Sequence, residues 1–258
     1  CTVAIHSNSE INSSAELGKN VRVGPFSTIG PRVKIGDRTE IGPNVHIVAD
    51  TVVGVDCRIF HGASIGGDPQ IAGVRDIVSS VEIGDQTTVR EFVTIHRSAN
   101  ENEKTTVGKG CLIMAYAHIA HDCVIGDDVV LVNATSLSGH IIVEDRAFIS
   151  GMIGAHQFVR FGKLSMTGGM SRIVKDILPF STVEGNPARL IGTNAIGLKR
   201  AGMTPAVRSG LKKAISFIMH DELNITQAIK KIEEEIEMSD EVRYLVNFVN
   251  QSNRGIIR

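Results

Sequence analysis

Four of the nine histidines in this chain fall between residues 118 and 156. Among them, His121 directly precedes Asp122, and Gly139 directly precedes His140. A histidine titrates near neutral pH, so it can take a proton from a hydroxyl group, and a neighbouring carboxylate can orient and stabilise the charged ring. A glycine leaves its backbone N–H open to a developing oxyanion. These residue types suit general-base catalysis, provided that the fold brings the two pairs together.

A six-residue repeat supplies that proximity. Of the 29 positions taken every sixth residue from Ile5 to Ile173, 25 are Ile, Leu or Val, and Gly often follows. Neither a helix nor a simple strand has this period. The pattern resembles the hexapeptide-repeat family, which implies a left-handed parallel β-helix with three hexads in each triangular coil. Residues eighteen apart then stack, so His121 and Asp122 lie beside Gly139 and His140 on adjacent coils.

Two segments are expected to leave the coil, namely residues 67–80 and the polar residues 98–105. Because Ile71 and Ile77 keep the phase of the repeat, residues 67–80 could instead be two degenerate hexads. After Ile173 the repeat fades and helical spacing begins, with a helix start at Thr204 and Pro205 and further apolar stripes at 225–236 and 242–249. We predict a mainly β fold: a left-handed parallel β-helix over residues 1–186 and a C-terminal α-helical domain over 187–258.

Composition excludes several classes of protein. The net charge of −1 argues against nucleic acid as a partner and against a polybasic membrane anchor, and no apolar run is long enough to span a membrane. No secretory leader is recognisable. The cysteines show no CxxC spacing, so we expect reduced thiols and a cytoplasmic protein; they are Cys1, Cys57, Cys111 and Cys123. Residues 187–258 carry 11 basic and 8 acidic side chains, a mildly basic surface that would suit an acidic protein partner.

Several longer motifs point to one family. They are TIHR (94–97), AHIAHDC (117–123), SGH (138–140), AHQF (155–158), STVEGNPA (181–188), GLKRAG (197–202) and RGIIR (254–258). Together they resemble the UDP-N-acetylglucosamine O-acyltransferases, which begin lipid A assembly. The resemblance implies a homotrimer that moves an (R)-3-hydroxyacyl chain from acyl carrier protein to the 3-OH of the UDP-sugar. It implies no metal, no cofactor and no covalent enzyme intermediate.

The resemblance also implies a role for each matching residue. His121 matches the general base, Asp122 the carboxylate beside it, and Gly139 the residue whose N–H faces the oxyanion. The remaining matches are His118 and His140 at the sugar, His156 and Gln157 in the substrate cleft, His96 near that cleft, Asn194 and Arg200 at the nucleotide and diphosphate, and Gly168 and Gly169 in the acyl groove. A glycine at 169 implies room for a long acyl chain.

One segment departs from the family pattern. The family has Asp and Lys in the loop after Ile65 and Gly66, where this chain has Ile71 and Gly73. Asp68, Arg75 or Asp76 could substitute for them. A 3-amino sugar or another nucleotide sugar therefore stays open as the acceptor.

Three other functions stay open. The first is the N-acyltransferase of the same pathway, although that family carries an extra N-terminal domain before its hexads. The second is a non-catalytic nucleotide-sugar-binding scaffold, and the third is a zinc carbonic anhydrase. Zinc needs three converging histidine nitrogens, and the spacing of three between His118 and His121 departs from the His-x4-His pair of that family.

Overall fold

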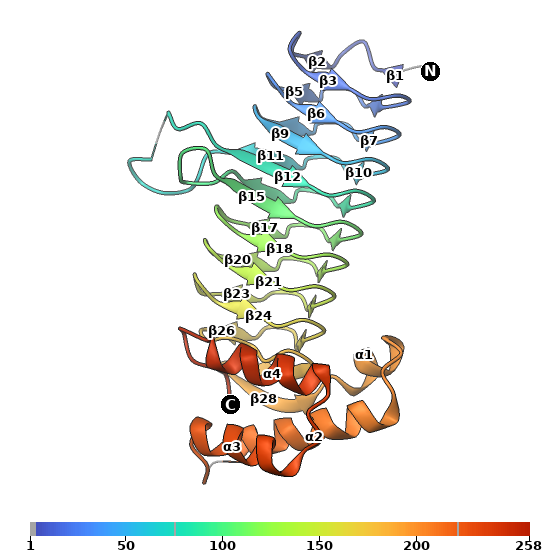
Figure 1. Ribbon diagram of the computed structural model, residues 1–258. Helices are drawn as coiled ribbons and strands as arrows, with labels where there is room; N and C mark the ends of the chain where they lie inside the picture. Colours follow the sequence, from blue (N-terminus) through green and yellow to red (C-terminus); the bar gives the residue numbers. More distant parts are fainter. Residues whose placement is uncertain (1–3, 75, 221) are drawn as a thin grey trace.

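The computed structural model describes residues 4–74, 76–220 and 222–258 (Figure 1). Short strands wind into a stack of triangular coils, and helices cover the C-terminal end of the stack (Figure 1). The predicted mainly β fold, a parallel β-helix followed by C-terminal helices, is confirmed. Cys1 and Arg75, which the sequence analysis named, lie outside the described residues.

The coils share three sheets, one for each side of the triangle. Sheet A runs in the order β1 (Ala4–Ile5), β4 (Arg22–Val23), β7 (Glu40–Ile41), β10 (Arg58–Ile59), β13 (Thr88–Val89), β16 (Leu112–Ile113), β19 (Val130–Leu131), β22 (Phe148–Ile149), β25 (Met166–Thr167), β27 (Ser181–Gly185) and β28 (Ala188–Thr193). Sheet B runs β2 (Glu10–Ile11), β5 (Thr28–Ile29), β8 (His46–Ile47), β11 (Ser64–Gly67), β14 (Thr94–His96), β17 (His118–Ile119), β20 (Ser136–Leu137), β23 (Gly154–Ala155) and β26 (Arg172–Ile173). Sheet C runs β3 (Glu16–Leu17), β6 (Lys34–Ile35), β9 (Thr51–Val53), β12 (Ser80–Ile83), β15 (Lys104–Val107), β18 (Val124–Ile125), β21 (Ile142–Val143) and β24 (Arg160–Phe161).

The strand register explains why the six-residue phase survives two interruptions. Most paired residues are 18 apart, as in the pair Ala4 and Arg22. Across the first interruption the spacing is 30, as between Arg58 and Thr88, and across the second it is 24, as between Thr94 and His118. The extra lengths are therefore 12 and 6 residues, which are whole hexads.

Both interruptions are loops, as predicted. Residues 68–79 connect β11 to β12, and Ile71 is 37% exposed, so this segment is not a pair of degenerate hexads. The second loop is shorter than predicted, because Lys104 and Thr105 already belong to β15 and pair with β12. Thr105 is buried, so this end of the predicted loop belongs to the coil.

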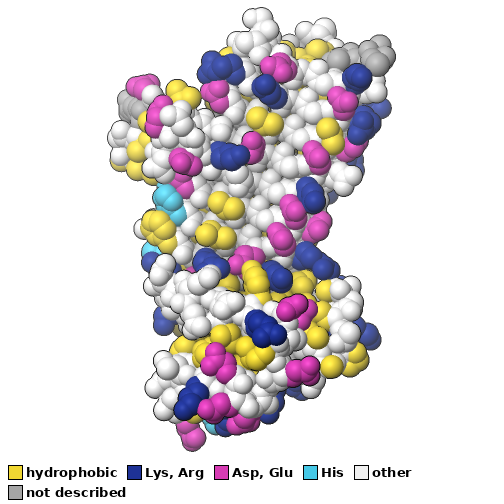
Figure 2. All heavy atoms as spheres, in the orientation of Figure 1, with side chains coloured by type: hydrophobic (Ala, Val, Ile, Leu, Met, Phe, Trp, Pro, Cys, Tyr) yellow, Lys and Arg dark blue, Asp and Glu magenta, His cyan; other side chains and the backbone are white. Residues whose placement is uncertain are grey.

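The aliphatic residue of each hexad fills the interior of the prism. Ile47, Ile65, Ile95 and Ile119 are stacked on one side of this core and are fully buried. Outward-facing charges form pairs between adjacent coils, such as Arg38 with Asp56 at 2.6 Å. Figure 2 shows basic and acidic side chains mixed over the coils. Cys57, Cys111 and Cys123 are free and buried, as expected for reduced thiols.

In the part of the chain that the structure describes, four helices follow the strands: α1 (Ala195–Arg200), α2 (Pro205–Met219), α3 (Ile225–Glu235) and α4 (Asp240–Asn250). Thr204 caps α2, as predicted, and Ser239 caps α4; each side chain accepts a hydrogen bond from a first-turn N–H. Helix α1 is not predicted by the sequence pattern, because it is only six residues long. No helix in the described part of the chain is long and apolar enough to cross a membrane.

Polar contacts join the helices to the coils. The Tyr244 hydroxyl donates to Oε2 of Glu144 at 2.8 Å, and Nη2 of Arg160 donates to Oε1 of the same carboxylate at 3.0 Å. Burial and the Glu144 contact raise the pKa of the Tyr244 phenol. The division at residues 186 and 187 stays a prediction, and it falls in the turn between β27 and β28.

Candidate active site

The pair His121 and Asp122 lies at the corner of the prism between sheets B and C. Nδ1 of His121 is 2.7 Å from Oδ2 of Asp122, and both side chains are about nine-tenths buried (12% and 9% exposed). A carboxylate oxygen only accepts, so Nδ1 carries a proton and Nε2 presents a lone pair. This is the tautomer that a general base requires.

Asp122 is held by the loop that follows β14. Its carboxylate accepts hydrogen bonds from the Ser98 hydroxyl, from the Ala99 N–H at 3.3 Å and from Nδ2 of Asn100 at 3.2 Å. Burial alone would raise the pKa of Asp122, but the hydrogen bonds from Ser98, His121 and Ala99 lower it below its ordinary value. The carboxylate is therefore ionised at neutral pH and can stabilise a charged imidazole.

Gly139 lies against the open edge of the His121 ring. It is buried, and an added Cβ would lie 2.5 Å from Nε2 of His121. At a different corner, between sheets C and A, the residue at the same place in its hexad donates its N–H to an aspartate one coil further on, as Lys109 does to Asp127. Among the described residues nothing accepts from the Gly139 N–H. The Gly139 N–H is thus an available hydrogen-bond donor beside Nε2 of His121, where a substrate hydroxyl would bind.

His140 completes this corner. Its backbone N–H donates to the His121 carbonyl at 3.1 Å, which confirms the predicted stacking of adjacent coils. Its Nε2 is 3.6 Å from Oδ2 of Asp122. The ring stacks on Phe158 at a centroid distance of 4.6 Å and meets the His121 ring edge-on at 5.2 Å. Packing therefore fixes the orientation of both rings.

His118 and His96 extend the cluster along sheet B. Nδ1 of His118 is 2.7 Å from the Thr94 hydroxyl, and its ring lies 5.2 Å from that of His96. Burial, followed by the nearby His96 and His121, lowers the pKa of His118 to about 4, so this ring is neutral at neutral pH. His96 also contacts the Asp68 carbonyl, and Asp68 pairs with Arg97 at 2.8 Å. Loop 68–79 therefore begins beside the cluster.

His156 lies one coil beyond His140. It is exposed, as is Gln157, and Nη2 of Arg254 lies 3.0 Å from its Nδ1. A cavity of about 560 Å³ adjoins this region and is lined partly by His140, Phe158 and Arg254. The C-terminal segment thus reaches the histidine corner, which the sequence analysis did not anticipate.

The other predicted site residues lie at different corners of the same chain. Gly168 and Gly169 follow β25, at the corner between sheets A and B. Asn194 caps α1 and donates to the Leu164 carbonyl at 2.9 Å, at the corner between sheets C and A. Arg200 is exposed at the end of α1. Within one chain, the structure brings together the histidines, Asp122 and Gly139 but not these four residues.

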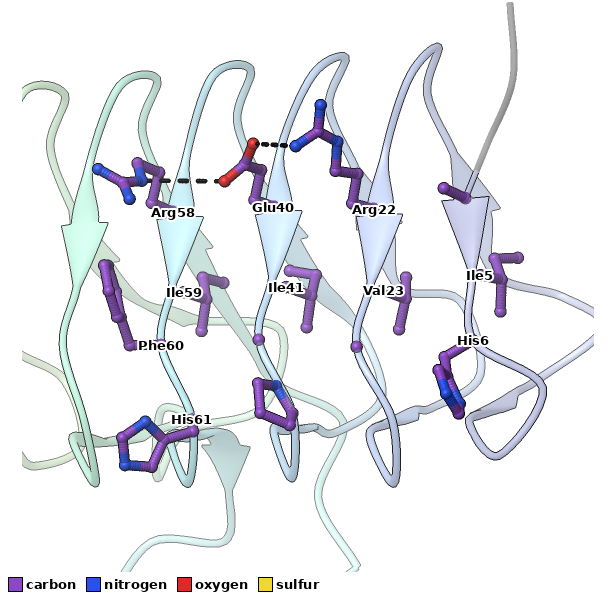
Figure 3. A pocket seen from close by; sticks show the side chains of 14 residues that line it. Ile5, His6, Arg22, Val23, Glu40, Ile41, Arg58, Ile59, Phe60 and His61 are labelled. Atoms are coloured by element: carbon purple, nitrogen blue, oxygen red, sulfur yellow. Dashed lines mark hydrogen bonds and ion pairs between the residues drawn. The ribbon is translucent and has the colours of Figure 1, made fainter.

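Two further features bear on ligands. His121, Asp122 and His140 offer three atoms within 4.8 Å of one another, which is a spacing that a metal ion could use. Hydrogen bonds already occupy both Asp122 oxygens, which suits a carboxylate that orients a base. A separate groove on sheet A of the first coils is lined by Arg22, Glu40 and Arg58, together with His6 and His61, and none of the residues of the histidine corner lines it (Figure 3).

Comparison with known proteins identifies the family. A family model described as UDP-N-acetylglucosamine O-acyltransferase, domain 2, matches residues 176–257, and one described as bacterial transferase hexapeptide (six repeats) matches residues 104–139. The acyl-[acyl-carrier-protein]–UDP-N-acetylglucosamine O-acyltransferase of Paraburkholderia phymatum is 44% identical over 259 residues, covering 98% of this chain and 99% of that protein. The chain belongs to this acyltransferase family.

Further members of the acyltransferase family agree with this assignment. The protein of the same name from Gloeothece citriformis is 48% identical over 202 residues, 78% of this chain and 73% of that protein. The solved UDP-N-acetylglucosamine acyltransferase structure from Bacteroides fragilis has a TM-score of 0.94 at 36% identity, covering 98% of this chain and 99% of that one. The Francisella novicida structure has a TM-score of 0.93 at 35% identity, with coverages of 98% and 94%.

Proposed function

We propose that this chain transfers an (R)-3-hydroxyacyl group from acyl carrier protein to the 3-OH of UDP-N-acetylglucosamine, the first step of lipid A assembly. The contact between Nδ1 of His121 and Asp122 carries the proposal, because it leaves Nε2 as a base pointed toward Gly139. The names of the relatives support the same donor and acceptor.

The reaction follows from these groups. Nε2 of His121 takes the proton of the sugar hydroxyl, and the oxygen attacks the thioester carbonyl carbon. The Gly139 N–H stabilises the oxyanion of the tetrahedral intermediate. The C–S bond then breaks, and the His121 imidazolium returns its proton to the leaving thiolate. Asp122 stabilises the imidazolium throughout, and no metal or organic cofactor takes part.

Neighbouring side chains would hold the substrate. His118 is neutral, so it can donate to or accept from a sugar hydroxyl without a charge of its own. His140, His156 and Gln157 line the same edge of the prism. Asp68, at the start of loop 68–79, pairs with Arg97 and contacts His96 through its carbonyl. We propose that it contacts the sugar, because Ile71 and Gly73 provide no charge.

We further propose a homotrimer. Five large apolar side chains lie exposed along the corner between sheets A and B, each in a left-handed backbone conformation that bulky residues seldom adopt. They are Phe26, Phe92, Tyr116, Met152 and Met170. Packing this corner against a neighbouring chain would cover the apolar residues. It would also allow the histidine corner of one chain to meet Asn194 and Arg200 of another.

Light scattering on purified protein tests the trimer. Tyr116→Asp should dissociate it, whereas Val124→Asp, which changes an exposed apolar residue on sheet C, should not. A monomeric wild-type protein would contradict the proposal.

The cytoplasm is the proposed compartment, since acyl carrier protein and UDP-sugars are available there. The mildly basic C-terminal region is the proposed docking surface for the acidic carrier protein.

The function is tested by acyl transfer with purified protein, UDP-N-acetylglucosamine and a series of 3-hydroxyacyl carrier proteins. Wild type should form product after treatment with a metal chelator, and His121→Ala should lose at least about 100-fold in kcat. Product only with the 3-amino analogue of the sugar would mean that loop 68–79 has changed the acceptor. Tight UDP-sugar binding without turnover would favour a binding scaffold, and loss of activity with the chelator would favour a metal at His121, Asp122 and His140.

A further inference from the structure

The C-terminal motif RGIIR has no part in the mechanism above, yet its first residue contacts the histidine edge. Nη2 of Arg254 lies 3.0 Å from Nδ1 of His156 and 3.2 Å from the Val174 carbonyl oxygen. Arg254 is partly buried, so this contact belongs to packed structure rather than to a free surface side chain.

The contact determines where His156 carries its proton. A guanidinium only donates hydrogen bonds, so Nδ1 of His156 must be the acceptor. A neutral imidazole that accepts at Nδ1 carries its proton at Nε2. Nδ1 also lies 3.3 Å from the Gln157 carbonyl, which would require a proton at Nδ1. The Arg254 contact is shorter and involves a permanent charge, so it prevails.

The segment that carries Arg254 is fixed to the coil by Asp176, which is 1% exposed. The Asp176 carboxylate accepts from the Ser252 hydroxyl at 2.6 Å and from the Arg160 N–H at 2.8 Å. Its backbone pairs with both Gly255 and Ile257, each at 2.9 Å. Hydrogen bonds on both sides of Arg254 therefore set the position of its side chain.

A second arginine holds the end of the motif. Arg258 donates from Nε to the Ile218 carbonyl at 2.8 Å and from Nη2 to the Leu223 carbonyl at 2.7 Å. These carbonyls lie at the end of α2 and in the connection to α3. The motif is thus anchored at Asp176 and at α2, with Arg254 directed to the histidine edge.

We propose that Arg254 is a positioning residue that holds His156 as the neutral Nε2–H tautomer, so that His156 donates a hydrogen bond from Nε2 to an acceptor oxygen of the UDP-sugar. The substrate half of this proposal rests on the proposed function. The tautomer half does not, because it concerns the unliganded protein.

The tautomer is tested by NMR on full-length protein with 15N-labelled histidine at pH 8. Wild type should show a protonated Nε2 and an unprotonated Nδ1 for His156, assigned with His156→Gln. Arg254→Met should give a mixture of tautomers, and Arg254→Lys should restore part of the preference. Arg243→Met is the control, since it removes an exposed arginine of α4. A wild-type proton on Nδ1, or an unchanged tautomer in Arg254→Met, would overturn the proposal.

Kinetics separate positioning from folding. Arg254→Met should raise the KM for UDP-N-acetylglucosamine about tenfold with a smaller change in kcat. In a His156→Ala background the same substitution should add little, because the two residues act as one unit. Ser252→Ala removes one tether to Asp176, but the backbone hydrogen bonds of Asp176 with Gly255 and Ile257 still hold Arg254 in place. This variant should therefore lower thermal stability without changing the tautomer. Equal effects of Arg254→Met in both backgrounds would show that Arg254 does not act through His156.

Discussion

A Cβ on Gly139 would lie 2.5 Å from Nε2 of His121, so the backbone of one coil touches the reactive edge of a ring on the next. The φ angle of Gly139 is not in the left-handed region, so the need for glycine here comes from close approach alone. The base therefore packs against the residue that carries the proposed oxyanion donor.

Gly139→Ala should therefore displace the His121 ring from its contact with Asp122. We expect kcat to fall about 100-fold, a loss comparable to removing one oxyanion donor. Steady-state acyl transfer measures this loss. Gly154→Ala on sheet B is the control, because a Cβ there meets nothing within 4 Å. Full activity in Gly139→Ala would mean that the ring and the N–H do not act together.

Asp122→Asn should impair both chemistry and stability. The amide removes the charge that stabilises the imidazolium, so kcat should fall by about 10²–10⁴-fold. Loss of a charged acceptor for Ser98 and Asn100 should lower the free energy of unfolding by about 1–3 kcal/mol. Steady-state kinetics and urea unfolding measure the two effects. Asp128→Asn, at an exposed corner with the same left-handed backbone, should change neither; a wild-type rate in Asp122→Asn would refute the proposed role.

The lowered pKa of His118 predicts a pH-dependent stability. Between the ordinary histidine value of 6.5 and about 4, the unfolded chain binds a proton that folded His118 does not. The free energy of unfolding should therefore decrease as the pH falls through this range, by on the order of 1 kcal/mol, since the side chain keeps some contact with water. The pKa of Asp122 is lowered from 3.8, so its contribution to the free energy of unfolding is lost only below the pH range in which His118 acts.

Urea unfolding at pH 7.5 and pH 5 measures this effect. His118→Gln should show less decrease in stability between the two values than wild type. The exposed His46 provides the comparison, because His46→Gln should keep the wild-type dependence. Identical pH dependence in wild type and His118→Gln would contradict the prediction.

Gly169→Met should shorten the preferred acyl chain. The nearest atom to an added Cβ at 169 is the Gly151 carbonyl oxygen at 3.6 Å, an ordinary contact, so a side chain can be attached there without moving the backbone. At Gly168 the Cβ would lie 2.7 Å from Cγ of Glu184, so that position is already crowded. Competition among 3-hydroxyacyl carrier proteins of different lengths reports the preference. An unchanged product distribution would rule out this groove as the determinant of length.

The sequence predicts those parts of the site that depend on the repeat. His121 meets His140 because the coil period is 18 residues, which follows from the six-residue phase once the resemblance to the hexapeptide-repeat family implies three hexads in each coil. Ser98 could not be predicted as a partner of Asp122, since the path of the loop after β14 decides that contact. Arg254 is nearly one hundred residues from His156 along the chain, and only the packing of the C-terminal segment on Asp176 brings them together.

The ends of the helices are harder to predict from the sequence than the apolar stripes. Asn194, which the family resemblance places at the nucleotide, also caps α1 with its side chain. Asn224 caps α3 reciprocally with Gln227, a pattern close to a capping box that the apolar stripe alone did not reveal. A helix of six residues has too few turns for hydrophobic periodicity to identify it.

The two loops add 12 and 6 residues, which are whole multiples of the hexad. The strand after each loop therefore pairs with the preceding coil in the same register as elsewhere in the stack. A change of composition in residues 68–79 consequently leaves every later coil in register. Substitutions in residues 68–79 can therefore change which acceptor the protein uses. The positions of His121, Asp122 and Gly139, and with them the acyl-transfer chemistry, need not change.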